Sequence, residues 1–299
     1  MDENKFLAER FEAHRTHLRA VAYRMLGSLS EADDAVQETW LRLHRADTSN
    51  VENLGGWLTT VASRVCLDML RSRASRGEAS LEVRVPDPIV SREDGVDPEH
   101  QALLADAVGL ALLVVLETLE PAERIAFVLH DMFDVPFEEI APLVERTEAA
   151  TRQLASRARR RVKEMAPAPD ADLTHQREVV DAFVAAARDG DLDKLLTVLD
   201  PDIVLRADYG AAPALGSRKL HGATAVSKQA LTFSRLGGPE LVRHPALVNG
   251  AAGLVVTRAG QPFSIMAFAI TGGKIVAIDI LADPERLRRL DLALLLPIS

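Results

Sequence analysis

The chain has 299 residues, 47% of them hydrophobic, and a formal net charge of −9, a length that suits two or three domains with their own cores. No apolar run approaches the ~20 residues that cross a bilayer, and Met1–Lys5 lacks the basic and then apolar order of a signal peptide, so we expect a cytoplasmic protein. The single cysteine, Cys66, excludes an internal disulfide and a cysteine-based zinc site.

Three amphipathic helices are predicted in the first 76 residues. The first covers 6–26 and stops at Gly27, a favourable residue after a helix end. The second covers 31–46 behind a capping-box-like start at Ser30. The third covers about 56–76, with apolar side chains on one face and arginines on the other. We expect residues 1–76 to form one small helical domain.

A second helical domain is predicted after a linker. Residues 77–100 have no helical period and contain three prolines and several acids, which indicates an acidic linker. An apolar helix at about 101–119 and a helix at 122–132 precede a further helix pair, and this domain covers 101–165. Residues 166–173 are rich in Pro and Ala and predict an extended tether.

The pair of helices between Phe137 and Val162 predicts a helix-turn-helix. Thr147 and Glu148 can cap its second helix, whose expected buried face consists of Ala150, Leu154, Ala158 and Val162. The opposite face carries Arg152, Gln153, Ser156, Arg157, Arg159 and Arg160. Such side chains bind phosphates and read base edges, so we expect this face to contact DNA. The alternative is a solvated helix whose arginines only offset the helix macrodipole.

The charge is distributed unevenly along the chain. Residues 57–76 carry a net +3 and residues 148–165 a net +4, whereas residues 77–147 carry −12. Two cationic helices separated by an acidic stretch predict two DNA contacts joined by a segment that repels DNA.

The pattern changes after residue 173. Helices are expected at 174–188 and 192–199, and then apolar runs alternate with a period of two. The candidate strands are 203–207, 246–249, 253–258, 263–271 and 274–281, with a Gly272-Gly273 hairpin between the last two. We therefore expect an α+β domain with a curved antiparallel sheet at 174–285, followed by a tail at 286–299.

Four blocks of the chain, in this order, resemble one family. They are Asp33-Asp-Ala-Val-Gln-Glu-Thr-Trp40, Trp57–Arg71, Phe127-Val-Leu-His130 and Glu148–Arg161. They are similar to the extracytoplasmic-function (ECF) group of sigma-70-type transcription initiation factors, here with an appended SnoaL-like (NTF2-like) domain. The resemblance implies a multidomain protein with two all-α sigma domains, region 2 at 1–76 and region 4 at 101–165, followed by an α+β domain with a cone-shaped sheet.

The resemblance also implies roles for the helical domains. The residues implied to dock on core RNA polymerase are Asp33, Asp34, Gln37, Glu38 and Trp40. Those implied to capture melted −10 promoter DNA are Asn50, Trp57, Arg64, Arg71 and Arg73. Those implied to bind duplex −35 DNA are Thr147, Arg152, Gln153, Ser156, Arg157, Arg159 and Arg160. Alternatively, the acids form a solvated face, and Trp40 and Trp57 belong to the core.

Three short motifs suggest that the third domain regulates the other two. Arg84-Val-Pro-Asp-Pro88 resembles the family's Trp-Leu-Pro-Glu-Pro linker element, Asp208-Tyr-Gly210 a Gly-rich motif, and Asp283-Pro-Glu-Arg-Leu287 a terminal Asn-Pro-Asp-Lys-Leu motif. The residues implied to meet are Val85, Pro86, Asp87, Pro88, Asp208, Gly210, Asp283, Pro284 and Leu287. The resemblance thus implies intramolecular control without a separate anti-sigma factor.

Other functions remain open for this sequence. The candidate acid or base groups of the third domain are Asp208, Tyr209, His221, His244 and Asp279, but no motif joins them into a catalytic set. We therefore expect no enzyme activity, cofactor or metal, while a small-molecule ligand in this domain is an alternative. The main rival function is an operator-binding helix-turn-helix regulator with a C-terminal ligand sensor, which leaves the acidic helix and the second cationic helix unexplained.

Overall fold

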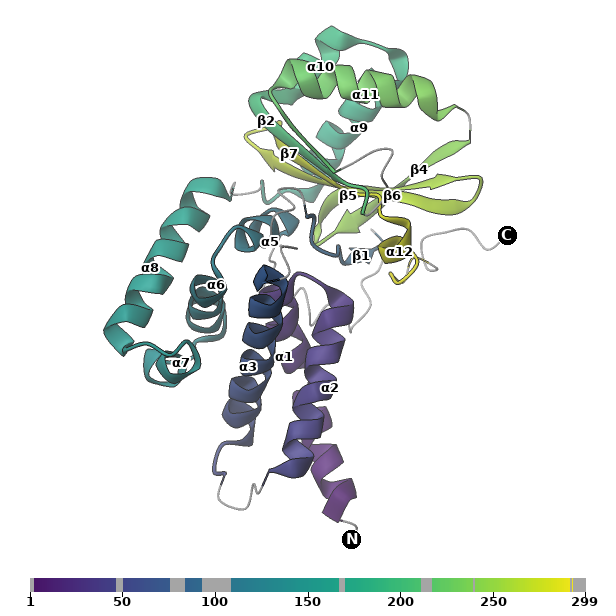
Figure 1. The fold of residues 1–299 in the computed structure, drawn as a ribbon. Coiled ribbons are helices and arrows are strands. Elements are labelled where there is room, and N and C mark those ends of the chain that lie inside the picture. The colour runs from purple at the N-terminus through teal and green to yellow at the C-terminus, as the bar shows by residue number, and fades with distance from the viewer. Residues whose placement is uncertain are drawn as a thin grey trace. The chain divides into compact units, whose positions relative to one another are not determined.

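The computed structural model describes residues 3–46, 51–75, 84–92, 109–166, 170–210, 217–238, 240–290 and 292 (Figure 1). The structure divides into two compact units, and one of the boundaries between them falls within helix α5 (Leu110–Glu117). The first unit contains the other helices up to Met165, and the second contains the described linker residues and the chain from Ala166 onward. Among the helices of the described residues, none has the length and apolar content to cross a membrane.

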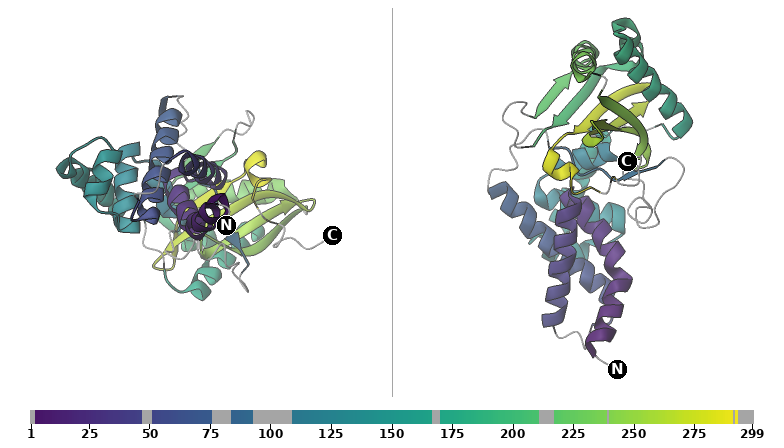
Figure 2. Two further views of the ribbon diagram at one scale, coloured as in Figure 1. Left: turned by 90° about the horizontal axis from the view of Figure 1, so that it is seen from below. Right: turned by 90° about the vertical axis from the view of Figure 1, so that its right-hand side faces the viewer.

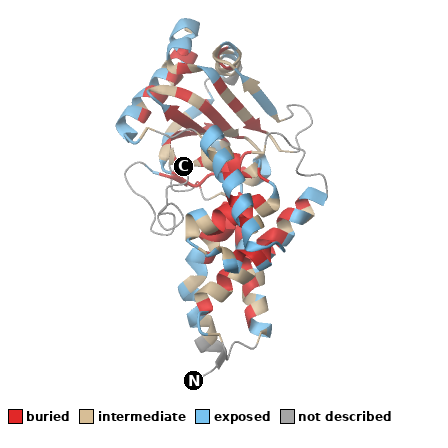
Figure 3. Cartoon of the chain, turned by 90° about the vertical axis from the view of Figure 1, so that its left-hand side faces the viewer, coloured by how far each residue is buried: buried red, intermediate tan, exposed pale blue. Residues whose placement is uncertain are grey.

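Three helices form the first part of the helical unit. They are α1 (Glu3–Leu26), α2 (Leu29–Arg45) and α3 (Leu54–Ser75), within a few residues of the predicted bounds. Their apolar faces meet in a core that includes Phe11, Leu18 and Leu58, and Figure 3 shows buried residues along the facing sides of the helices. Complete burial raises the pKa of the Cys66 thiol to about 12, so this thiol stays protonated at neutral pH.

The second part of the helical unit contains the helix-turn-helix. Its elements are α6 (Pro121–Phe127), the π-helical turn η2 (Val128–Met132), α7 (Phe137–Leu143) and α8 (Glu148–Met165). The helix predicted at 122–132 is therefore continued by a π-helical turn. Glu145 adopts the left-handed conformation (φ 55°) in the turn before α8. Thr151, Ala155 and Ala158 form the buried face of α8. Of the predicted face, Ala158 is buried, whereas Ala150, Leu154 and Val162 are only partly buried.

Buried arginines connect the elements of the helical unit. Arg124 of α6 is 3% exposed and donates to the carbonyl oxygen of Met25 at 2.8 Å and to Glu117 at 3.0 Å. The Met25 carbonyl lies in the last turn of α1, where carbonyls lack partners within the helix. The guanidinium of Arg124 therefore satisfies the end of α1 while its charge is balanced by a carboxylate.

A seven-stranded sheet forms the second unit. Its strands are β1 (Val90–Ser91), β2 (Leu199–Asp208), β3 (Arg218–His221), β4 (Leu241–Val248), β5 (Ala251–Arg258), β6 (Gln261–Thr271) and β7 (Lys274–Leu281). Their order is β1-β4-β5-β6-β7-β2-β3. The expectation of an antiparallel sheet is wrong for one pair, because β2 and β7 run parallel. Strands β2 and β7 can pair in parallel because a long connection of helices, strands and loops separates them in the chain.

Three helices cover one face of this sheet (Figures 1 and 2). They are α9 (Leu173–Asp189), α10 (Leu192–Val198) and α11 (Ala223–Gly237), while the short α12 (Pro284–Leu287) follows the last strand. Asp172 caps α9 and Asp191 caps α10, each accepting backbone amide hydrogen bonds. Phe183 of α9 packs edge-on against Phe268 of β6 in the core. This arrangement confirms the expected α+β domain, in which helices cover one face of a sheet.

Helix α11 and the short edge strands β1 and β3 were not predicted. Strands β1 and β3 have two and four residues, too few for a period-two pattern to stand out. The predicted Gly272-Gly273 hairpin is confirmed, and both glycines have positive φ.

Gly253 offers a test of the sheet packing. A Cβ atom at this position would lie 2.8 Å from the carbonyl oxygen of Met266 and would collide with the Val248 side chain. We expect Gly253→Ala to destabilise the protein by ~1–3 kcal/mol through overpacking, seen as a lower midpoint of urea unfolding. Gly109→Ala is the control, because no atom lies within 4 Å of its new Cβ; equal midpoints for the two variants would refute this packing.

Candidate functional site

The exposed face of α8 carries most of the predicted −35 residues. Arg152, Gln153, Ser156 and Arg160 are exposed. The Thr147 hydroxyl accepts a hydrogen bond from the Ala150 amide at 3.2 Å, as expected for a residue that begins the helix. Arg152 pairs with Glu148 one turn earlier at 2.7 Å, an exposed pair of the kind that adds little stability. The early part of α8 thus presents an arginine and an amide side by side to solvent.

Two of the arginines expected to contact −35 DNA from α8 have partners inside the helical unit. Arg157 donates to Glu123 at 2.8 Å, and Arg159 donates to Asp131 at 2.6 Å. Glu123 also accepts from Arg161 at 3.4 Å, and its side chain is only 8% exposed. Arg157 and Arg161 therefore compensate a largely buried carboxylate of α6, which a neutral side chain could not do.

The acidic face of α2 lies where the sequence predicted it. Asp33, Asp34 and Gln37 are exposed, with Asp33 accepting from Arg19 at 2.6 Å. Glu38 is partly buried and pairs with Arg42 at 2.9 Å. These groups form a polar surface along one side of the helix.

Trp40 lies between this surface and the core. Its ring is 5.0 Å from that of Phe11 and 4.4 Å from that of His44, and the residue is partly buried. Trp40 thus packs on the core of the three-helix bundle and remains partly exposed.

The predicted −10 residues on α3 fall into different environments. Arg64 and Arg71 are exposed, and Arg71 pairs with Glu145 of the helix-turn-helix turn at 3.2 Å. Trp57 is partly buried against the core of the three-helix bundle. Asn50 lies outside the described residues.

Arg73 was expected to face outward, and this expectation is wrong. The residue is 6% exposed, and its guanidinium donates to the Leu26 carbonyl at 3.0 Å and to Glu31 at 3.1 Å. It holds the end of α1 against the start of α2, so a DNA contact by Arg73 would require breaking these bonds. Its role in −10 recognition stays a prediction without geometric support.

In the second unit, the three predicted regulatory motifs meet around one arginine. Arg286 of α12 donates from Nε to Asp87 at 2.7 Å, from Nη1 to Asp208 at 2.9 Å and from Nη2 to the Val85 carbonyl at 2.6 Å. Asp208 also accepts from the Val85 amide at 3.1 Å. We call Val85, Asp87, Asp208 and Arg286 the linker clasp. It joins residues of the linker to the ends of β2 and α12.

The remaining residues of these motifs support the linker clasp. Asp283 caps α12 by accepting from the Glu285 amide at 2.8 Å, and Pro284 occupies the first helical position. Gly210 has a φ of 63° and lies directly against the Asp283 carboxylate, so no larger residue fits. Pro86, Pro88 and Leu287 are buried.

Sequence reasoning missed two residues that hold the linker. Arg286 stands inside the quoted terminal motif, but its spacing predicts only a surface charge on a short helix. Asn249 makes two hydrogen bonds with Ile89. Its side-chain oxygen accepts from the backbone amide of Ile89 at 3.1 Å, and its backbone amide donates to the carbonyl oxygen of Ile89 at 2.8 Å. The positive φ of Asn249 (49°) is typical of Asn at a turn, but its partner lies 160 residues away.

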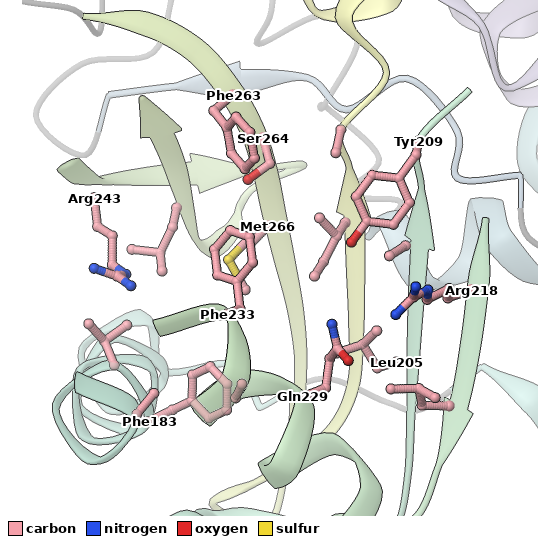
Figure 4. Close-up of a pocket in the computed structure, with 18 residues that line it drawn as sticks. Phe183, Leu205, Tyr209, Arg218, Gln229, Phe233, Arg243, Phe263, Ser264 and Met266 are labelled. Atoms are coloured by element: carbon pink, nitrogen blue, oxygen red, sulfur yellow. The ribbon is translucent and has the colours of Figure 1, made fainter. Parts of the chain in front are cut away.

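The candidate acid and base groups do not form a catalytic set in the described residues. His244 bonds to Thr257 at 2.9 Å, and Asp279 pairs with Arg206 at 3.0 Å. Burial raises the pKa of the Asp279 carboxyl, against the opposing charge of Arg206. His221 is exposed and Asp208 belongs to the linker clasp, so only Tyr209 of the five lines the main apolar cavity (Figure 4).

Comparisons with known proteins agree with this architecture. A family model described as sigma-70 region 2 matches residues 10–76, and one described as sigma-70 region 4 matches residues 109–162. The ECF RNA polymerase sigma factor SigJ of Mycobacterium tuberculosis is 40% identical over 289 residues, which cover 92% of this chain and 91% of SigJ. The probable ECF RNA polymerase sigma factor SigI of the same organism is 36% identical over 296 residues, covering 96% of this chain and 97% of SigI.

The fold is also similar over nearly the whole length to a solved structure. The crystal structure of M. tuberculosis SigJ matches with a TM-score of 0.75 and 37% identity, covering 95% of this chain and 99% of that chain. The helix-turn-helix, the acidic helix and the sheet domain thus occur together in a relative of matching length. The chain therefore belongs to the ECF RNA polymerase sigma factors, the family that acts with core RNA polymerase in promoter-directed transcription initiation.

Proposed function

We propose that this sigma factor reads −35 duplex DNA with α8, holds melted −10 DNA near α3, and binds core polymerase through the acidic face of α2. We also propose that its C-terminal domain restrains the linker through the linker clasp and so controls initiation without a separate anti-sigma factor. The observation that carries the regulatory part is the partly buried Arg286, whose three donors are all directed to linker residues or to Asp208.

Helix α8 suits the −35 role because the side chains suited to reading bases and the arginine suited to binding a phosphate lie at different positions along the helix. Arg152 and Gln153 lie exposed near the helix start, where side chains of a recognition helix meet base edges. Arg160 lies exposed two turns later and makes no ion pair with a described residue. It is therefore available to a phosphate, whereas Arg157 and Arg159 would first have to leave Glu123 and Asp131.

The −10 role rests on fewer groups of α3. Arg64 and Arg71 offer exposed positive charge, and the partly buried ring of Trp57 offers a stacking surface. Binding of single-stranded DNA requires this combination of a cationic track and an aromatic face. Arg73 is left out of this proposal because its guanidinium is used inside the three-helix bundle.

Polymerase binding is assigned to α2 on grounds of charge and shape. Asp33, Asp34 and Gln37 are exposed, and the partly exposed Trp40 follows Gln37 by three residues on the same helix. A rim of acids around a partly exposed aromatic ring is typical of a hot spot that docks on a basic surface.

The linker clasp suits a regulatory role because it fixes the segment between the two DNA-binding regions. Regions 2 and 4 must reach two promoter elements at once, so their linker sets how far they can separate. A linker bound to the C-terminal domain has fewer conformations, which favours one arrangement of the sigma regions over others.

Transcription with purified components tests the overall function. The chain is added to core RNA polymerase on a promoter that has −35 and −10 elements of the ECF type. A sigma factor yields transcripts that begin at that promoter. A shift of the DNA by the chain alone, with no transcript, would instead support the operator-binding alternative.

The division of labour on α8 predicts two different phenotypes. Arg160→Ala removes a phosphate contact, so we expect it to weaken all −35 sequences alike and to reduce the salt slope of binding by about one. Arg152→Ala removes a base contact, so we expect a changed preference at one or two −35 positions, by ~1–3 kcal/mol per position. Holoenzyme binding to a promoter library at several salt concentrations measures both.

A control separates these effects from a general loss of charge. Arg235→Ala removes an exposed positive charge from α11 in the other unit, and we expect it to leave both readouts unchanged. The division is refuted if Arg152→Ala and Arg160→Ala give the same uniform loss over the library.

Opening the linker clasp is expected to raise transcription. Arg286→Met keeps the aliphatic stem and removes all three donors, which leaves Asp87 and Asp208 as buried charges without their partner. Coupling energies between such sites are ~1–3 kcal/mol, so promoter-directed transcription by the full chain should increase by about fivefold or more. Arg289→Met is the matched control, an exposed arginine three residues later. Unchanged or reduced transcription by Arg286→Met, with the fold intact, would rule out restraint by this contact.

A further inference from the structure

An apolar cavity lies in the C-terminal domain between α9, α11 and the covered face of the sheet (Figure 4). Its walls are formed by the rings of Phe183, Phe233 and Phe263 together with Leu205, Leu254 and Met266. The cavity has a volume of about 70 Å³. All of its lining residues belong to the C-terminal unit, and none is acidic.

Three polar groups in this apolar wall have no partner in the described part of the chain. The Tyr209 hydroxyl, the Gln229 amide and the Arg243 guanidinium make no hydrogen bond or ion pair with another described residue. Figure 4 shows the hydroxyl and the amide pointing into the cavity from one side, with the guanidinium on the other. Polar groups held at an apolar wall without a partner cost free energy, so their placement favours a ligand that satisfies them.

The positive side chains at the cavity indicate that its ligand carries a negative charge. Arg243 is partly buried, and burial lowers the pKa of its guanidinium, an effect that the nearby charge of Arg188 increases. Arg218, on the side of Tyr209, adds a second positive charge to the cavity lining. A cation that has lost water and gained no carboxylate partner is stabilised by an anion.

We propose that this cavity binds a small amphipathic organic acid. Its carboxylate lies on the Arg243 guanidinium, its branched apolar body lies between Phe233, Phe263 and Met266, and a hydroxyl or keto group meets Tyr209 and Gln229. The cavity has about half the volume of the ~150 Å³ apolar cavity that accepts benzene, so it accommodates a branched apolar end of about three or four carbons, while the carboxylate is held at the Arg243 guanidinium.

Calorimetric titration of the full chain tests the proposal with isovalerate as the probe. Isovalerate is expected to bind, whereas isovaleramide, which has the same shape and no charge, is expected to bind at least about tenfold more weakly, because hydrogen bonds to a charged group are the stronger kind. Binding of both with equal affinity, or of neither, overturns the proposal.

Variants assign the carboxylate to one arginine. Arg243→Met preserves the length and packing of the side chain and should weaken isovalerate at least about tenfold, without changing the weak binding of the amide. Arg188→Met is the matched control, since Arg188 is exposed and pairs with Asp189 at 3.1 Å. We expect it to retain the wild-type affinity within about twofold, because exposed charges are screened. An equal loss in both variants would mean that only the general positive field acts.

The second polar contact has its own readout. Hydroxyisovalerate should bind several-fold more tightly than isovalerate to the wild-type chain, and Tyr209→Phe should abolish this difference while isovalerate binding stays the same. A difference that persists in Tyr209→Phe would overturn the contact assigned to Tyr209. These titrations need neither polymerase nor promoter DNA, so their outcome is independent of the role proposed for the linker clasp.

Discussion

The C-terminal unit depends on the placement of one guanidinium group. Arg286 brings together the linker at Val85 and Asp87, the end of β2 at Asp208, and its own short helix. Asp87 and Asp208 are buried, so both carboxylates have lost most of their hydration and need the partly buried guanidinium as a partner. The surrounding features serve this requirement: Asp283 begins the helix at the right residue, and Gly210 leaves room for Asp283 to do so.

The helical unit uses its arginines in two distinct ways. Arg73 and Arg124 are buried, and each satisfies carbonyl oxygens at the end of α1 while pairing with a glutamate. Arg64, Arg152 and Arg160 remain exposed. A count of arginines along α3 and α8 therefore overestimates the charge available to DNA, because part of that charge neutralises acids of the same fold. The net positive charge of each segment thus indicates where DNA can bind, but it does not indicate how strongly.

Much of the architecture was predictable because it is encoded locally. Helical spacing correctly placed Ala158 on the buried face of α8, and the pair Gly272-Gly273, both with positive φ, indicated a hairpin. What escaped prediction depends on partners distant in sequence. Nothing near Arg286 reveals Asp87, which lies 199 residues earlier, and the helical pattern of α3 gives no sign that Arg73 turns inward to Glu31. Similarly, β1 becomes a strand only because β4 offers it an edge.

That edge pairing has a consequence for the sheet itself. Val90 and Ser91 pair with Val248 and Leu247, so residues of the linker cover the outer edge of the last two residues of β4. If the linker departs, Leu247 and Val248 lose this partner, and unpaired amide and carbonyl groups at an apolar strand edge can recruit another strand. The linker is thus both a connection between two DNA-reading regions and a protective strand for the third domain. Release of the linker would therefore expose a short additional edge of the sheet to pairing with another strand.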